Sequence, residues 1–257
     1  MAERFFVSDW YELVKKYTIP REKYEMDKKE METLADCLFY CEENLSDKDI
    51  VKKFPRLAKF LKAELEKYKQ GIFIRWDNRS PKDYFFYYCK TAEDIHPKPI
   101  KTVEECFRVL LNSERLAEDI FAGLFNGVLW ASPFVEIKHE MRGFVYENKL
   151  FALSQYYYKD YDRLLAEHAM FYAEHYFDLW DKIRLPFSTY VIDFGWNMQA
   201  KKPIIIELNP FNKLTDPCLF SWDLLHKLKD QGRFIVRVNQ LQIVEYEDGV
   251  EREYPQW

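Results

Sequence analysis

Apolar residues in the first half of this chain recur mostly every three or four positions, the period of an amphipathic helix. The pattern predicts helices over residues 27–45 and 54–70. A short apolar run at residues 71–76 predicts a strand, and the aromatic run at residues 83–90 predicts the next one. One or two further helices are expected over residues 103–125.

The second half mixes short apolar runs with one long helical pattern. Its predicted elements are, in chain order, a hairpin, a long amphipathic helix, a strand pair, a short helix and a closing strand, over residues 140–156, 159–183, 188–209, 222–230 and 233–239. The residues after these are polar and are expected to form a tail. Alternating strands and helices, with antiparallel hairpins in the second half, indicate an α+β protein of two lobes.

The strand that ends at Asn209 carries the first candidate chemistry. Three isoleucines predict a buried strand, and Pro210 ends it because proline cannot donate to a ladder. Glu207 and Asn209 are two positions apart, so their side chains leave the same face. A carboxylate and an amide oxygen suit Mg²⁺, although a solvated Glu beside a turn Asn is the alternative.

Asp193 adds a second carboxylate. If the strand pair folds at Ala200, Asp193 lies opposite Glu207, with Cβ atoms about 5 Å apart. Two like charges in that position are destabilising unless a cation lies between them. Asp193, Glu207 and Asn209 therefore predict a metal site.

The hairpin at residues 140–156 places an arginine on a largely apolar face. With Asn148 and Lys149 as its turn, Arg142 lies opposite Gln155. A buried guanidinium is costly without a counter-charge, and a triphosphate would supply one. The alternative is an arginine that reaches solvent from the edge of the sheet.

Composition narrows the class of protein. The net charge of −5 argues against a nucleic-acid binder. With only 7 glycines the chain has no glycine-rich phosphate loop, so side chains must hold any phosphate. Five cysteines without a C-x-x-C pattern indicate free thiols in a reducing compartment. We expect a cytoplasmic protein, because no signal peptide or membrane span is recognised.

Several segments resemble one family. Residues 205–222, IIELNPFNKLTDPCLFSW, are similar to the signature of the cell division cycle protein 123 family, a divergent branch of the ATP-grasp fold. Other segments resemble further family motifs in the same order, at residues 10–22, 73–83, 140–156 and 234–239. The resemblance implies an α+β, ATP-grasp-like fold of two lobes with ATP bound between them. The implied parts are a helical segment, a smaller lobe, a larger lobe with the metal site, and a polar tail, at residues 1–70, 71–135, 136–239 and 240–257.

The resemblance also implies a set of ATP-binding residues. Arg75 stands where the family has its first phosphate-contacting lysine, Arg142 matches an arginine that contacts the terminal phosphate, and residues 128–131 match the hinge that offers backbone hydrogen bonds to adenine. The complete expected set is Arg75, Lys82, Leu129, Trp130, Arg142, Gln155, Asp193, Glu207 and Asn209, of which the last three hold Mg²⁺.

Members of the resembled family bind the gamma subunit of eukaryotic translation initiation factor 2 and promote assembly of that complex. We therefore expect ATP and that subunit as partners, no nucleic acid or membrane, and a monomer. The alternative is an ATP-grasp ligase that joins a carboxylate to an amine through an acyl phosphate. Trp10 and Tyr11 in the amino-terminal motif either attach the first helix to the core or form a docking surface for the partner.

Overall fold

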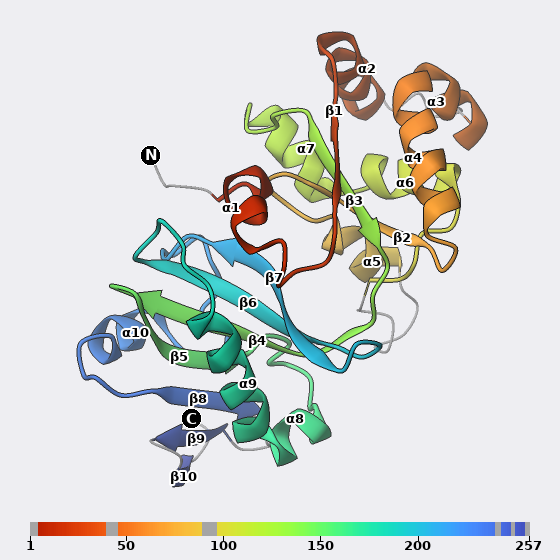
Figure 1. Cartoon of the computed structure of the whole chain (residues 1–257). Helices are drawn as coiled ribbons and strands as arrows, with labels where there is room; N and C mark the ends of the chain where they lie inside the picture. Colours follow the sequence, from red (N-terminus) through yellow and green to blue (C-terminus); the bar gives the residue numbers. More distant parts are fainter. Residues whose placement is uncertain (1–4, 40–45, 89–96, 240–242, 248–249, 255–257) are drawn as a thin grey trace. The chain divides into compact units, whose positions relative to one another are not determined.

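The computed structural model describes residues 5–39, 46–88, 97–239, 243–247 and 250–254 (Figure 1). The chain divides into two compact units, and each is described by itself. Pro20–Phe134 form one unit, which we call the small-sheet unit. Met1–Ile19 and Val135–Trp257 form the other, the large-sheet unit. The helical segment expected over residues 1–70 is therefore not one part, because its first residues belong with the carboxy-terminal half.

In its described residues, the small-sheet unit combines three antiparallel strands with six helices. Its strands lie in the order β1-β3-β2 and are β1 (Glu22–Glu25), β2 (Ile72–Trp76) and β3 (Val128–Pro133). Its helices are α2 (Lys28–Phe39), α3 (Asp47–Lys53), α4 (Pro55–Lys67), α5 (Lys82–Tyr88), α6 (Val103–Leu111) and α7 (Glu114–Phe121). The helices predicted over 54–70 and 103–125 and the strand predicted over 71–76 are confirmed.

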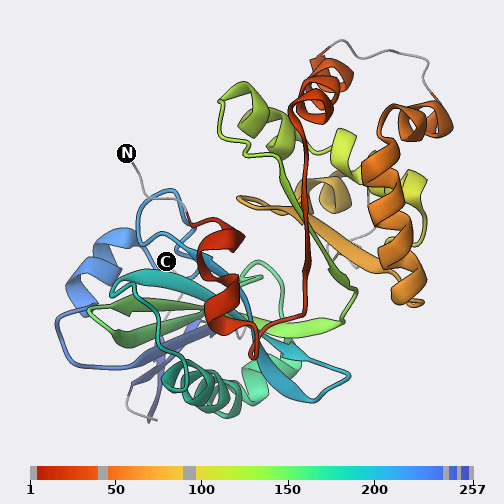
Figure 2. The same ribbon diagram turned by 45° about the horizontal axis from the view of Figure 1, so that its top comes forward.

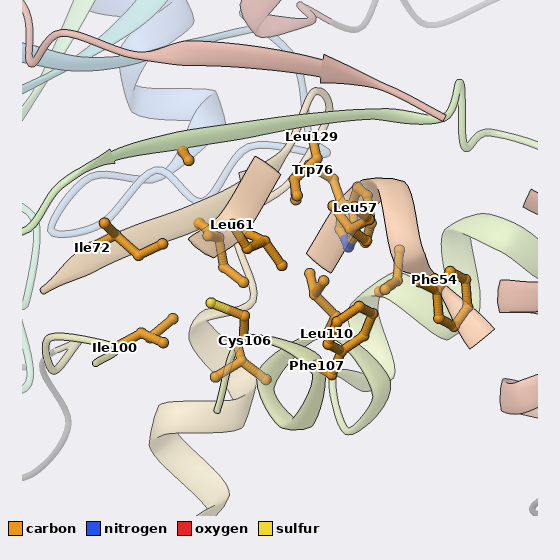
Figure 3. Close-up of a cluster of buried hydrophobic side chains, with 14 of the residues drawn as sticks. Phe54, Leu57, Leu61, Ile72, Trp76, Ile100, Cys106, Phe107, Leu110 and Leu129 are labelled. Carbon is orange, nitrogen blue, oxygen red and sulfur yellow. The ribbon is translucent and has the colours of Figure 1, made fainter. Parts of the chain in front are cut away.

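Alternate residues of β2 build the core of this unit. Ile72, Ile74 and Trp76 point into a cluster formed with Leu61 of α4 and Phe107 of α6 (Figure 3). Burying each such side chain stabilises the fold by roughly 1.5–3 kcal/mol. Successive strand residues face opposite ways, so Arg75 leaves the other face of the sheet.

The aromatic run at residues 83–90 was predicted as a strand, and this prediction is wrong. It lies in α5, Lys82–Tyr88, with its last two residues outside the described part of the chain. Pro81 before the helix and Asp83 in its first turn are helix-start residues, and they prevail over the strand preference of aromatic residues. The Asp83 carboxylate also accepts hydrogen bonds from Ser113 Oγ and the backbone N–H of Arg115, which hold this helix start against α7.

The large-sheet unit is built on seven strands in the order β10-β9-β8-β5-β4-β6-β7 (Figures 1 and 2). Among the described strand pairs of this sheet, β5 with β8 is parallel and the others are antiparallel. The strands are β4 (Ile137–Tyr146), β5 (Lys149–Gln155), β6 (Tyr190–Asn197), β7 (Lys202–Asn209), β8 (Ile235–Asn239), β9 (Ile243–Glu247) and β10 (Val250–Tyr254). The helices are α1 (Val7–Val14), α8 (Arg163–Glu167), α9 (Ala169–Asp181) and α10 (Trp222–Leu228).

Helix α9 packs on one face of this sheet and α10 packs on the other. On one face Phe194 stacks on Tyr176 of α9, with ring centroids 5.3 Å apart. Gly143 leaves room for that stack, because a Cβ there would lie 3.0 Å from the Phe194 ring. On the other face Phe144 packs against Trp222 of α10.

Two sequence predictions for this unit need correction. The long helix expected over residues 159–183 is two helices, because His168 has a non-helical backbone that ends α8 and precedes α9. The expected tail contains β9 and β10, which extend the sheet beyond β8. The predicted strand pair, short helix and closing strand are confirmed as β6, β7, α10 and β8. Within the part of the chain that the structure describes, no helix has the length and apolar character needed to cross a membrane.

Candidate functional site

The pairing of five strands places polar residues in one line across the large sheet. Asp193 on β6 lies between Arg142 on β4 and Glu207 on β7. On the other side of Arg142 the line continues through Ser154 on β5 to Arg237 on β8. Paired residues share a face, and this face is the one that Phe144 and α10 occupy. We call these five residues the polar row.

The predicted pairing of the two carboxylates is confirmed. Asp193 lies directly opposite Glu207, and Val191 lies opposite Asn209, so Glu207 and Asn209 leave the same face of β7. The pairing shifts by one residue only after Asp193, toward the turn. The hairpin that folds near Ala200 therefore has the expected register at the site itself.

The predicted register of the other hairpin is wrong. Its turn is formed by Glu147 and Asn148, which both have positive φ, rather than by Asn148 and Lys149. Two-residue turns of this handedness match the twist of paired strands, and Asn accepts that backbone conformation readily. With a further shift between residues 144 and 145, Arg142 lies opposite Ser154 and not Gln155.

Arg142 and Asp193 form a buried ion pair at the centre of the row. Nε and NH2 of Arg142 donate to the two carboxylate oxygens at 2.7 and 2.9 Å, and the residues are 5% and 1% exposed. NH1 donates to the carbonyl oxygen of Asp216, and the guanidinium lies 4.7 Å from the centre of the Tyr156 ring. Burial alone would lower the pKa of Arg142, but the charge and hydrogen bonds of Asp193 raise it well above its ordinary value.

Asp193, Glu207 and Asn209 bring two carboxylates and an amide to one face of the sheet, and their binding of Mg²⁺ remains a prediction. Nδ2 of Asn209 donates to Asp193 Oδ2 at 3.1 Å, so the carboxylate accepts three hydrogen bonds in all. A carboxylate has about four acceptor positions, so about one remains at Asp193 for a cation. Among the described residues no three His, Cys, Asp or Glu side chains are grouped to hold a metal unaided. Two carboxylates with an amide oxygen suit Mg²⁺, which usually completes its shell with water and phosphate.

The loop between β7 and α10 is bonded to the polar row. Ser154 Oγ accepts a hydrogen bond from the backbone N–H of Leu219, and Arg237 NH1 donates to its carbonyl oxygen at 3.0 Å. The Arg237 guanidinium also lies 4.6 Å from the centre of the Phe220 ring. Cys218 has a positive φ in this loop, and burial raises the pKa of its thiol to about 12, an effect that Arg142 opposes and the charges of Asp193 and Asp216 reinforce.

Four residues of this arrangement did not emerge as candidates from the sequence. They are Ser154, Tyr156, Asp216 and Arg237. Asp216 lies inside the signature segment at residues 205–222, and that position could have marked it as a candidate. The other three depend on strand register and on loop placement, which local patterns do not determine.

Gln155, expected to contact the nucleotide, is bonded within its own unit. Its Nε2 donates to the carbonyl oxygens of Tyr157 and Asp160, and its Oε1 accepts from the backbone N–H of Asn239. These bonds join the loop after β5 to β8. A contact of Gln155 with ATP remains a prediction.

In the small-sheet unit, Arg75 and Trp130 lie opposite each other on β2 and β3. Both are buried and leave the face opposite the helical core, since Ile74 and Ala131 occupy the core face. Nε of Arg75 donates to the carbonyl oxygen of Trp76, and Nε1 of Trp130 donates to Asp77 Oδ1 at 2.7 Å. Their roles toward a nucleotide remain predictions.

The segment expected as the adenine hinge forms the central strand of this sheet. Val128 to Ala131 pair with β1 on one side, and β2 pairs with β3 from Leu129 onward on the other. The side chain of Leu129 lies in the core cluster. The hinge role concerns the backbone of this segment, and a contact with adenine remains a prediction.

Lys82 is the first residue of α5 and is half-buried. The loop before it is held by α7, because Arg79 pairs with Glu118 and Asp119 and Asn78 Nδ2 donates to Asp119. A contact between Lys82 and phosphate remains a prediction.

Trp10 and Tyr11 are buried on α1. The segment after this helix runs beside β7, where Thr18 pairs with Ile205. The burial of Trp10 and Tyr11 favours the alternative in which these aromatics attach the first helix to the core, over an exposed docking surface.

Known proteins resemble this chain along most of its length. Two structures of Cdc123 from Schizosaccharomyces pombe share its fold: one has a TM-score of 0.66 at 22% identity and covers 88% of this chain and 91% of the other. The second, truncated at its carboxy terminus, has a TM-score of 0.68 at 23% identity and covers 91% and 94%. The predicted α+β, ATP-grasp-like fold is confirmed, because the chain shares the fold of Cdc123.

Sequence comparison agrees with the fold. The translation initiation factor eIF2 assembly protein of Vanderwaltozyma polyspora is 34% identical over 90 residues, which cover 34% of this chain and 24% of that protein. The aligned segment thus spans about a quarter of that relative. The D123 family model matches residues 12–256. The chain belongs to the D123 family, that of cell division cycle protein 123.

Proposed function

We propose that this protein binds ATP with Mg²⁺ and assists the assembly of eukaryotic translation initiation factor 2 by acting on its gamma subunit. The observation that carries the proposal is the family match over residues 12–256, nearly the whole chain. The name of the relative from Vanderwaltozyma polyspora supports the assembly role, through an aligned segment that is a short part of that protein.

The polar row, together with Asn209 on the same face, supports the nucleotide part of the proposal. Asp193, Glu207 and Asn209 offer hard oxygen ligands, and the positive charge of Arg142 beside them suits phosphate oxygens. When bound, Mg²⁺ would neutralise phosphate charge. The residues themselves bind and orient: Arg142 donates two hydrogen bonds to the Asp193 carboxylate, and the bond from Asn209 Nδ2 fixes the direction of its amide.

Calorimetry with Glu207→Ala tests the nucleotide site. Glu207 is half-buried and belongs to the row but not to the Arg142–Asp193 ion pair, so its removal should leave the fold intact. We expect Mg-ATP to bind about tenfold more weakly, or about 1.4 kcal/mol. Glu147→Ala, in the exposed turn between β4 and β5, is the matched control and should bind normally. Equal affinity of both variants for Mg-ATP would rule out the proposed metal site.

A second experiment tests the partner and the ligase alternative. Immobilised protein is incubated with purified gamma subunit, with and without Mg-ATP, and nucleotide products are quantified. An assembly factor should retain the subunit and need not consume ATP. Failure to retain the subunit under both conditions refutes the assembly role, and ADP released in proportion to a modified acceptor identifies a ligase.

A further inference from the structure

Exposed apolar side chains are concentrated on α8, α9 and the residues just before α8 in the large-sheet unit. Among the described residues, eight large hydrophobic side chains are exposed, and four of them lie between residues 161 and 177. They are Tyr161, Leu164, Phe171 and Phe177. Scattered single residues of this kind need no explanation, but a local concentration is typical of an interaction surface.

Three carboxylates run along the exposed side of α9. Glu174, Asp178 and Asp181 are spaced by four and three positions, so they lie in one strip, and all three are exposed. The helix contains no Lys or Arg, and like charges at this spacing destabilise it. None of the three forms an ion pair with a described residue. Exposed acids on three other helices do pair with a base one turn away: Glu12 with Lys15, Asp49 with Lys52, and Glu167 with Arg163.

Aromatic side chains are held in place on both sides of this strip. Phe171, 47% exposed, packs against Trp196 with ring centroids 5.7 Å apart, and the His175 ring lies 4.3 Å from it. Phe177, 37% exposed, packs against Phe234 at 5.5 Å. Their rings need little further ordering to bind a partner, which lowers the entropic cost of association.

We propose that the outer face of α9, formed by Glu174, Asp178 and Asp181 with Phe171 and Phe177, docks a basic amphipathic segment of a partner protein. Lysines or arginines of that segment meet the three carboxylates, and its apolar side chains pack on the two phenylalanines. Glu174 and Asp181 are seven positions apart along the helix, or about 10 Å, which matches about two turns of a helical ligand.

The sign of the charge identifies the class of partner. Nucleic acid and anionic lipid surfaces are repelled by an acidic strip. A second copy of this chain would bring the same carboxylates to the contact, where they repel each other. The proposal is independent of the nucleotide site, because Phe194, on which α9 packs, leaves the opposite face of the sheet from Asp193.

Fluorescence anisotropy with the full chain tests this surface. The probe is a short labelled helical peptide of Lys, Leu and Trp with its lysines on one face, and its counterpart carries Glu in place of Lys. We expect the basic peptide to bind and the acidic one not to bind. Neutralising the strip with Glu174→Gln, Asp178→Asn and Asp181→Asn should weaken binding about tenfold and reduce its salt dependence, since each exposed charge pair contributes modestly.

Two matched controls separate the face from general electrostatics. The first makes the same change in net charge on the small-sheet unit, with Glu32→Gln, Glu66→Gln and Glu114→Gln, all exposed. The second compares Phe171→Ser with Phe121→Ser on α7, which is 59% exposed. We expect only the α9 variants to lose affinity for the peptide.

Three results would each overturn the proposal. They are no binding of the basic peptide to the unaltered protein, equal losses in the α9 and control variants, and a dimer in sedimentation that the α9 substitutions abolish. The last result would identify the face as an interface between copies of this chain. Because every substituted side chain is exposed, thermal unfolding should confirm that all variants fold.

Discussion

The substitution Arg142→Met leaves the carboxylate of Asp193 buried without its cation. Asp193 is 1% exposed, so water cannot replace the guanidinium that donates to both of its oxygens. Breaking a buried ion pair by removing one partner costs about 3–5 kcal/mol. We expect that loss for Arg142→Met and a similar one for Asp193→Leu. The double variant should recover most of it, because an apolar pair of similar volume has no charge to bury.

Urea unfolding measures the free energy of unfolding of each variant. A chain with two units need not unfold in one step, so hydrogen exchange at the amides of β4 and β6 is used to assign the change to the large-sheet unit. Arg163→Met is the control, because it breaks an exposed pair with Glu167 and should cost less than about 1 kcal/mol. The reasoning fails if each single variant loses less than about 1 kcal/mol and their effects simply add.

Three further predictions follow from buried contacts. Gly143→Ala should lower the free energy of unfolding by about 1–3 kcal/mol, because its Cβ would overpack Phe194; an unchanged melting temperature contradicts this. Burial favours a higher pKa for Asp162, but hydrogen bonds from His139 and backbone N–H groups outweigh burial and lower this pKa. The ionised carboxylate therefore stabilises the fold above its unfolded pKa of about 4, and this stability is lost as the pH falls through the folded pKa. His139→Ala should therefore move acid unfolding, followed by circular dichroism, to higher pH. Cys218, with a thiol pKa of about 12, should react slowly with iodoacetamide at pH 8 until urea opens the fold, and fast labelling of this residue in the native protein refutes the raised pKa.

The pairing of Asp193 with Glu207 was predictable because the two strands are joined by a short polar connection. In such a hairpin the middle of the connection determines which residues face each other. The same reasoning misplaced Arg142, because Glu147–Asn148 and Asn148–Lys149 are both plausible turns and a bulge leaves no local sequence signal.

Other features depend on contacts between distant parts of the chain. Ser154 and Arg237 are neighbours because β5 and β8 pair in parallel, and such strands are joined by a long connection that leaves register open. The burial of Tyr11 likewise depends on residues far along the chain. The aromatic run in α5 was misassigned because its strand preference is strong and the helix-start residues before it are few.

The division of the chain also has a consequence for the order in which the protein folds during synthesis. The small-sheet unit, Pro20–Phe134, is synthesised before β4 of the large sheet and well before β7. The helix α1 emerges before that unit, yet the segment that follows it pairs at Thr18 with Ile205, about 190 residues later. Until then Trp10 has no sheet to cover it, so a nascent chain arrested before β7 exposes an apolar helix that chaperones can bind.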